Sequence, residues 1–176
     1  MATREERIRD RLFPGVKTYD RKDGGFAAVP LILRRAQFLF DPRRWQIYTY
    51  ICMRAGAAGV AWFNLTELGW DIGFNSVPKL RPYVDSLVSE GWVKMAHSQG
   101  KDYYVIVDPL VVLARLFYRN ELTEDRKDAL DELLDSLHLP SLEDLVQQLP
   151  APGSQVSPGP AGPKTVAALP PLPVGL

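Results

Sequence analysis

The sequence predicts a mainly α-helical fold with one small β-hairpin, an α+β class, from three observations. Apolar residues recur at helical spacing in several segments that begin at capping residues. Two strand-like runs, WVKMA and DYYVIVD, are joined by HSQGK, whose glycine suits a hairpin turn. The end of the chain is rich in Pro, Gly, Ala and Ser and cannot bury enough apolar surface to fold. We therefore expect a basic N-terminal arm with one short helix, residues 1–25, a folded region, and a disordered tail, residues 150–176.

The first clear helix of the folded region begins at Asp41, a good N-cap, and has Pro42 at its first position. Gly56 is a natural stop. Its apolar stripe comprises Tyr48, Ile51, Cys52 and Ala55. On this stripe Cys52 is expected in the core and not as a reactive thiol. The preceding segment, FAAVPLILRR, is either extended or opens a short helix at Pro30.

The run GVAWF predicts a short strand, and two further helices follow it. Asn64 caps the first, LTELGWDI, with Glu67 placed as in a capping box. Gly73 ends this helix in a turn, and Gly91 ends the next one. The apolar face of that next helix comprises Leu80, Val84 and Leu87.

Two prolines fall in the helix that carries Leu80, Val84 and Leu87. Pro78 lies in the first turn, where a missing N–H costs nothing. If the helix begins at Val77, Pro82 lies in its interior, where a proline costs ~3 kcal/mol or kinks the helix. Two interpretations remain open. The helix begins near Pro82 after a lead-in over residues 76–81, or it begins earlier and is bent at its start.

The order helix, strand, helix, turn, helix, hairpin over residues 26–108 resembles a known family. It is similar to the winged helix-turn-helix domains of bacterial, phage and plasmid replication initiators and transcription regulators. In that family an extended VP-L segment precedes the first helix, as VPLIL does here, and a pattern like LAxxLG-xxxTVxRxLxxLxxxGWI follows the strand. The corresponding stretch here is LTELGWDIGFNSVPKLRPYVDSLVSEGWV, with the two prolines as departures. The resemblance implies that the helix with the apolar face of Leu80, Val84 and Leu87 enters the major groove of double-stranded DNA.

The resemblance also implies which side chains contact DNA. On the last helix the outward residues are Ser76, Lys79, Arg81 and Tyr83, with Asp85 beside them. Arg81 could make a bidentate contact to guanine. The hairpin offers Lys94, His97, Ser98, Gln99 and Lys101. Phosphate clamps are expected from Arg43 and Arg44, in the first turn of the first helix, and from Arg34 and Arg35 before it.

Residues 109–149 predict an acidic helical extension. Its first helix, DPLVVLARLFYRN, has an apolar face of Leu110, Leu113, Ala114 and Phe117. Its second, capped by Thr123, has a stripe of Leu130, Leu133, Leu134 and Leu137. Pro140 breaks this helix, and Ser141 begins a last short piece, LEDLVQQL. The leucine stripe either pairs two copies or a protein partner, or folds back on the rest of the chain. The LPPLP motif in the tail could dock on a proline-reading groove, or the tail is only a tether.

The charges are unevenly distributed although the formal net charge is zero. Residues 1–54 contain 12 Lys and Arg against 6 Asp and Glu, whereas residues 109–150 contain 4 against 9. Either a polyanion meets the basic N-terminal half, or surface charge simply varies along the chain.

No catalytic motif is present, so the chain is not expected to be an enzyme. His97 and His138 have no metal-ligand spacing with Cys52, and there is no phosphate-binding loop. We expect a cytoplasmic protein with no cofactor, no metal, no signal peptide and no membrane span. The main hypothesis is a DNA-binding replication-associated or transcriptional regulatory factor. The alternative is a winged-helix protein–protein interaction module that docks through its acidic, leucine-rich C-terminal helices.

Overall fold

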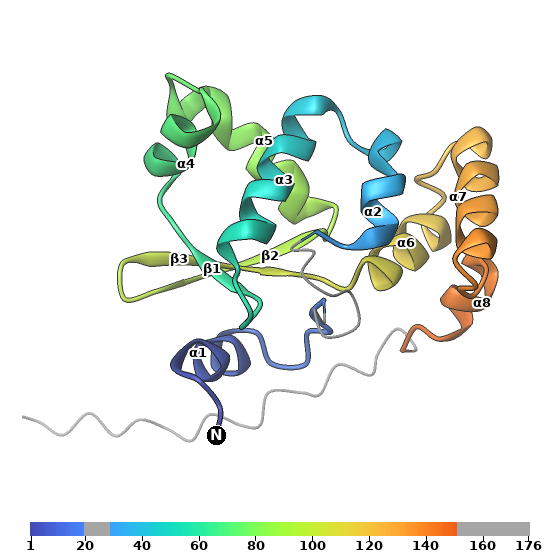
Figure 1. Ribbon diagram of the computed structural model, residues 1–176, viewed down its shortest axis with the longest axis horizontal. Coiled ribbons are helices and arrows are strands. Elements are labelled where there is room, and N and C mark those ends of the chain that lie inside the picture. Colours follow the sequence, from blue (N-terminus) through green and yellow to red (C-terminus); the bar gives the residue numbers. More distant parts are fainter. Residues whose placement is uncertain (20–28, 151–176) are drawn as a thin grey trace, which may run out of the picture.

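The computed structural model describes residues 1–19 and 29–150 of the chain. Helices surround a small three-stranded antiparallel sheet (Figure 1), which confirms the predicted mainly α-helical fold with a small β-hairpin. The helices are α1 (Arg4–Leu12), α2 (Leu31–Arg35), the 3-10 helix η2 (Gln37–Leu39), α3 (Pro42–Arg54), α4 (Leu65–Ile72), α5 (Val77–Ser89), α6 (Pro109–Tyr118), α7 (Glu124–Ser136) and α8 (Leu142–Gln147). The strands are β1 (Val60–Trp62), β2 (Val93–Ser98) and β3 (Lys101–Ile106). Beyond Pro150, the predicted tail lies outside the described residues.

The strand order in the sheet is β1-β3-β2, so the strand that precedes α4 joins the hairpin along β3. Alternation along β3 gives the sheet two buried faces. Tyr104 and Ile106 pack into the main core together with residues of α3, α4 and α5. Tyr103 and Val105 face the other way and pack with Phe13, which follows α1. The sheet is therefore covered on both sides.

The N-terminal residues pack against the sheet and do not extend away from it as an arm. Phe13 is buried against Val105 and its neighbours. Arg9 donates a hydrogen bond from Nη1 to the carbonyl of Ala58 at 3.2 Å. The backbone near Thr18 forms an antiparallel bridge with Val107. Residues 1–19 are thus part of the folded unit, while the rest of the predicted arm, residues 20–25, lies outside the described residues.

Several local predictions are confirmed. Asp41 caps α3, because Oδ1 accepts from the backbone N–H groups of Arg43 and Arg44 at 3.0 Å each. All four residues of the predicted α3 stripe are buried, and Cys52 lies in the core. Pro30 precedes α2, so the interpretation of a short helix at that position is the one that holds.

The C-terminal helices fold back on the rest of the chain. Leu130 and Leu134 on α7 are fully buried in the main core, where α7 packs beside α2 and α8 (Figure 1). On α6 the buried face centres on Val112, Leu113, Ala114 and Leu116, while the predicted Leu110 and Phe117 are only half-buried. Of the two interpretations of the leucine stripe, folding back is therefore the one that this structure contains.

Candidate nucleic-acid interface

Helices α4 and α5 are joined by a tight turn that the local sequence explains. Oδ1 of Asn64 accepts from the backbone N–H of Glu67 at 2.7 Å, which begins α4. Gly73 ends α4 in the left-handed conformation, with φ of 79°. The N–H of Phe74 then donates to the carbonyl of Gly69 at 2.8 Å. A Cβ on Gly69 would lie 3.2 Å from the carbonyl oxygen of Phe74, so glycine permits this close return of the chain.

Helix α5 is one helix that contains both prolines. It begins at Val77 after Ser76, whose side chain makes no capping hydrogen bond. Pro78 lies in the first turn and Pro82 lies inside the helix. The interpretation in which the helix begins only near Pro82 is therefore wrong.

The predicted contact residues of α5 differ in exposure. Lys79 and Arg81 are exposed, whereas Ser76 and Tyr83 are half-buried. The ring of Tyr83 packs edge-on against Phe74 in the turn, with 5.9 Å between ring centroids. Lys79 and Arg81 are thus the predicted α5 residues most open to a ligand, and Tyr83 is partly used in holding the turn.

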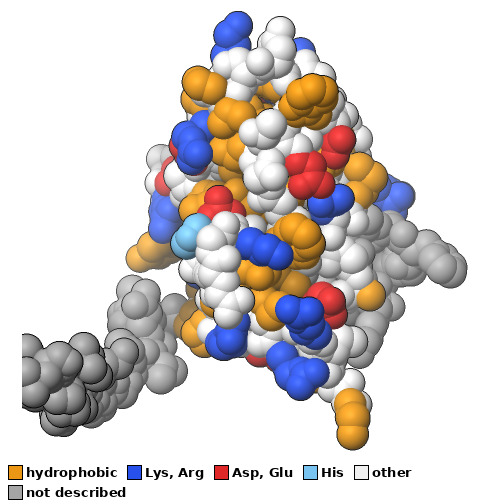
Figure 2. Space-filling model, turned by 90° about the vertical axis from the view of Figure 1, so that its left-hand side faces the viewer, with side chains coloured by type: hydrophobic (Ala, Val, Ile, Leu, Met, Phe, Trp, Pro, Cys, Tyr) orange, Lys and Arg blue, Asp and Glu red, His pale blue; other side chains and the backbone are white. Residues whose placement is uncertain are grey.

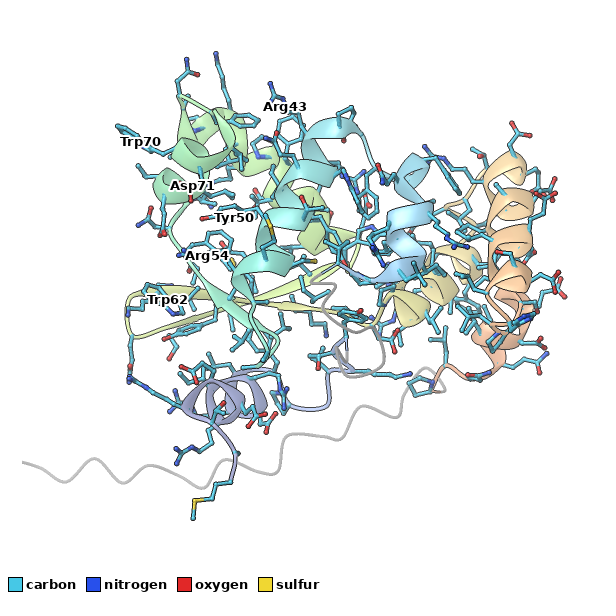
Figure 3. The ribbon with its side chains drawn as sticks, in the orientation of Figure 1. Arg43, Tyr50, Arg54, Trp62, Trp70 and Asp71 are labelled. Carbon is cyan, nitrogen blue, oxygen red and sulfur yellow. The ribbon has the colours of Figure 1, made fainter. Side chains whose placement is uncertain are left out.

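Arg43 reaches the same turn from the start of α3, as the side-chain view shows (Figure 3). Its guanidinium lies 5.0 Å from the centroid of the Phe74 ring, a cation–π contact. It also donates to Oε1 of Gln46 at 3.2 Å. The side chain remains exposed. Arg43 is therefore placed next to α5 with its charge on the surface.

The hairpin ends in a two-residue turn. Gln99 and Gly100 both have positive φ, 52° and 73°, the requirement of a type I′ turn that matches the twist of the strands. Ser98 and Lys101 pair across the end of the hairpin. One pair further in, His97 Nδ1 and Asp102 Oδ1 are 2.8 Å apart, and both side chains are exposed to solvent. The predicted turn at Gly100 is confirmed.

The Tyr104 hydroxyl marks where α5 approaches the hairpin. Burial raises the pKa of Tyr104 to about 12. The nearby charges of Asp102 and Asp85 contribute to this rise, whereas Arg81 opposes it. Tyr104 lies in the main core with Leu80 and Val84 of α5, so α5 and the Tyr104 side chain are on the same side of the sheet.

The two lysines of the hairpin lie in different surroundings. Lys101, next to the turn, holds Nζ 4.2 Å from the centroid of the exposed Trp62 ring. Lys94 lies at the other end of the hairpin and lines a cavity of about 220 Å³ with Lys17 and Arg115. The structure therefore places Lys101 at the hairpin tip and Lys94 apart from it, beside α6 and α8.

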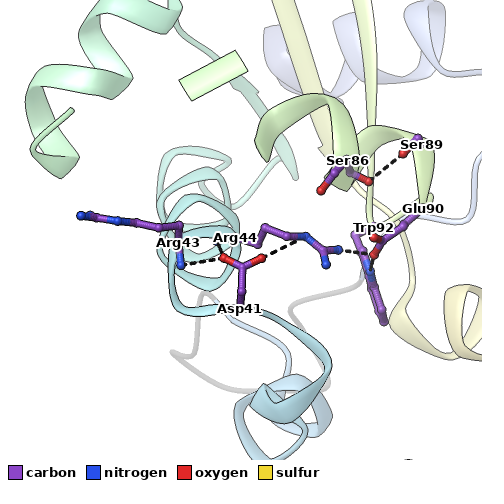
Figure 4. Close-up of polar contacts among 7 residues, drawn as sticks. All are labelled: Asp41, Arg43, Arg44, Ser86, Ser89, Glu90 and Trp92. Atoms are coloured by element: carbon purple, nitrogen blue, oxygen red, sulfur yellow. Dashed lines mark hydrogen bonds and ion pairs between the residues drawn. The ribbon is translucent and has the colours of Figure 1, made fainter. Parts of the chain in front are cut away.

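Arg44 points into the protein (Figure 4). Its side chain is only 16% exposed, forms an ion pair with Glu90 after α5, and lies over the Phe40 ring at 5.6 Å. The same carboxylate oxygen of Glu90 accepts a hydrogen bond from Trp92 Nε1 at 3.0 Å. The prediction that Arg44 clamps a phosphate does not fit this geometry, because its guanidinium ties the start of α3 to the end of α5.

Arg34 and Arg35 are exposed on α2, which lies beside α7 (Figure 1). In the same view the hairpin tip lies at the opposite end of the molecule from α7. These two arginines are therefore not gathered with Lys79, Arg81 and Lys101.

Two exposed tryptophans were not among the predicted contact residues. Trp70 on α4 is 82% exposed and Trp62 on β1 is 52% exposed. Both project from the side of the molecule that carries the hairpin (Figure 3). Seen from that side, apolar, basic and acidic side chains are interspersed over the surface (Figure 2). The sequence could have indicated that Trp70 is exposed, because Trp70 does not lie on the apolar stripe that contains Leu68 and Ile72.

Behind this surface, two polar pairs join α3 to α4. The hydroxyl of Tyr50 donates to Oδ2 of Asp71 at 2.7 Å, and Arg54 donates to Oε1 of Glu67 at 2.6 Å. Burial, followed by the hydrogen bond to Asp71, raises the pKa of Tyr50 to about 12. These pairs fix α4, and with it the turn that leads to α5.

Among residues 1–19 and 29–150, no three His, Cys, Asp or Glu side chains are grouped so that they could hold a metal ion. In the same residues no helix has the length and apolar character needed to cross a membrane. The comparisons with known proteins found no matching family model, no similar curated protein and no similar solved structure.

Proposed function

We propose that this chain is a winged helix-turn-helix protein that binds double-stranded DNA through α5 and the tip of its hairpin. The observation that carries the proposal is the α4–turn–α5 unit, in which the outer side of α5 is exposed and the exposed hairpin tip follows in the next element. The element order and the pairing of β1 with β3 also support it. In this proposal the chain binds DNA as a replication-associated or transcriptional factor and carries out no reaction.

The charges near α5 divide into two groups. Arg43, Lys79, Arg81 and Lys101 are exposed on or beside the α4–α5 turn and the hairpin tip. They are the candidates for contacts to phosphates and to bases. His97 and Gln99 lie at the same end of the hairpin and extend this set. Arg44 and Lys94 leave the proposed contact set, because the first is engaged inside the fold and the second lines a separate cavity.

The alternative, docking of a protein through the acidic C-terminal helices, has less support. Leu130 and Leu134 are already buried in the chain's own core. What α7 offers to a partner is a charged surface that includes Asp128, Asp131 and Asp135. Such a partner would be held by exposed ion pairs, each of which contributes little.

Titration of the full chain into labelled random-sequence duplex DNA at low salt tests the proposal. Binding should weaken steeply as salt rises, because phosphate contacts release counterions. Lys101→Ala should lower the affinity. It should also reduce the slope of the logarithm of the binding constant against the logarithm of salt concentration by about 0.9 for each phosphate that the variant no longer neutralises. Lys94→Ala is the matched control, a lysine of the same hairpin away from its tip. A wild-type chain without affinity for duplex DNA at low salt contradicts the proposal.

A further inference from the structure

The outermost line of α5 is formed by its two prolines. At about 100° per residue around a helix, the buried residues Leu80, Val84 and Leu87 define the inner side of α5. The direction opposite to them is occupied by Pro78 and Pro82, both exposed. The centre of the outward side is therefore apolar.

Charged residues lie on both edges and at the far end of this proline line. Lys79 and Arg81 fall on its two edges, roughly a sixth to a third of a turn from Pro78. Asp85 continues the line toward the C-terminus of the helix. A groove that received α5 along this direction would meet the proline rings first and the two basic side chains at either edge.

Pro82 has no evident role in the fold itself. A proline inside a helix removes one backbone hydrogen bond and weakens the helix. Pro78 and Pro82 are both exposed. The rings thus present rigid apolar surface to solvent on the outer side of the helix.

The major groove of DNA offers one apolar group at its base edges, the C5-methyl of thymine. A proline ring has no donor and fits no hydrogen-bonding edge, but it can cover a methyl group and remove it from water. We infer that Pro78 and Pro82 are specificity-determining residues that read thymine methyl groups in the major groove. This inference rests on the proposed DNA binding by α5 and names what the centre of that helix recognises.

The test compares thymine with uracil, which differs only by the missing methyl. Duplexes enriched by the wild-type chain from a random pool are copied with dTTP or with dUTP, and the affinities of the full chain for the two products are compared. Each methyl that a ring covers should contribute about fourfold, from the transfer of one buried CH₂ or CH₃ group. We expect the uracil duplexes to bind correspondingly more weakly.

Variants assign the effect to the prolines. Pro82→Ser and Pro78→Ser replace the rings by a small polar group, and removal of Pro82 should not prevent folding because it restores a helix hydrogen bond. In the double variant the preference for thymine over uracil should vanish. Lys79→Ala is the control, which should weaken both duplexes equally and keep their ratio.

The possible failures are distinguishable. Equal affinity of the wild-type chain for thymine and uracil duplexes overturns the inference and leaves the proposed DNA binding intact. A thymine preference that survives in the double proline variant also overturns it, because the methyl groups are then read elsewhere. Absence of binding to any duplex at low salt overturns the proposed function together with the inference.

Discussion

Replacing Glu90 by alanine should destabilise the fold through two partners at once. The carboxylate pairs with Arg44 at the start of α3 and accepts a hydrogen bond from Trp92 Nε1 (Figure 4). Trp92 is almost completely buried, so its N–H loses its acceptor inside the fold when Glu90 is replaced. Of the ion pairs of Arg44, the one that remains is with Asp41, at 3.9 Å.

The expected cost is about 3 kcal/mol. A buried donor left without an acceptor costs about 1–3 kcal/mol. The ion pair is partly exposed, 16% for Arg44 and 32% for Glu90, so its loss falls between that of a surface pair, about 0–1 kcal/mol, and a buried one, about 3–5 kcal/mol. Glu90→Gln keeps an acceptor for Trp92 and should cost only about 1 kcal/mol.

Urea unfolding followed by circular dichroism measures these differences in the free energy of unfolding. The matched control is Glu132→Ala, an exposed glutamate of α7 for which a change within about 0.5 kcal/mol is expected. If Glu90→Ala falls within that same range, the carboxylate does not hold α3 to α5 and the reasoning is refuted.

Three further outcomes are expected. Pro82→Ala should raise the free energy of unfolding by about 2 kcal/mol in urea, since ~3 kcal/mol of helix propensity is regained and up to ~1 kcal/mol of unfolded-chain restriction is lost. Pro78→Ala should change it little, and a loss of stability in Pro82→Ala would contradict a continuous α5. Because burial raises the pKa of Tyr104 from 10.0 to about 12, its contribution to stability is complete below pH 10 and is lost as the pH rises toward 12. In thermal melts between pH 10 and pH 12, the melting temperature should fall less with rising pH for Tyr104→Phe than for the wild-type chain. An equal fall in both would refute the role of Tyr104. In DNA titrations Lys101→Ala should weaken binding and Lys94→Ala should not, and the reverse order would place the interface beside α6.

The local features of the fold could be predicted because short-range chemistry determines them. Asp41 and Asn64 cap helices with their own side chains, and Gly73 and Gly100 adopt positive φ where turns require it. The apolar stripe of α3 follows from helical periodicity alone. None of these depends on a residue far away in the chain.

The features that were missed depend on distant partners. Arg44 looks like Arg43 in sequence, but its carboxylate lies 46 residues away at Glu90, and no spacing rule reveals that pair. The N-terminal segment looks like an arm because α1 itself buries no residue. Its anchor is Phe13, just after the helix, and an isolated aromatic gives no periodic signal.

In the proposed complex, affinity and sequence preference would come from different elements. The outward side of α5 carries Lys79 and Arg81 together with Asp85, so the helix brings little net charge to the phosphates. Arg43 and Lys101 are exposed outside this helix, and each lies over an aromatic ring. Loss of either should therefore weaken binding to all sequences alike, whereas changes at Pro78, Arg81 or Pro82 should mainly alter which sequence is preferred. A helix whose centre is two proline rings can contribute to selection only if other residues hold the DNA against it.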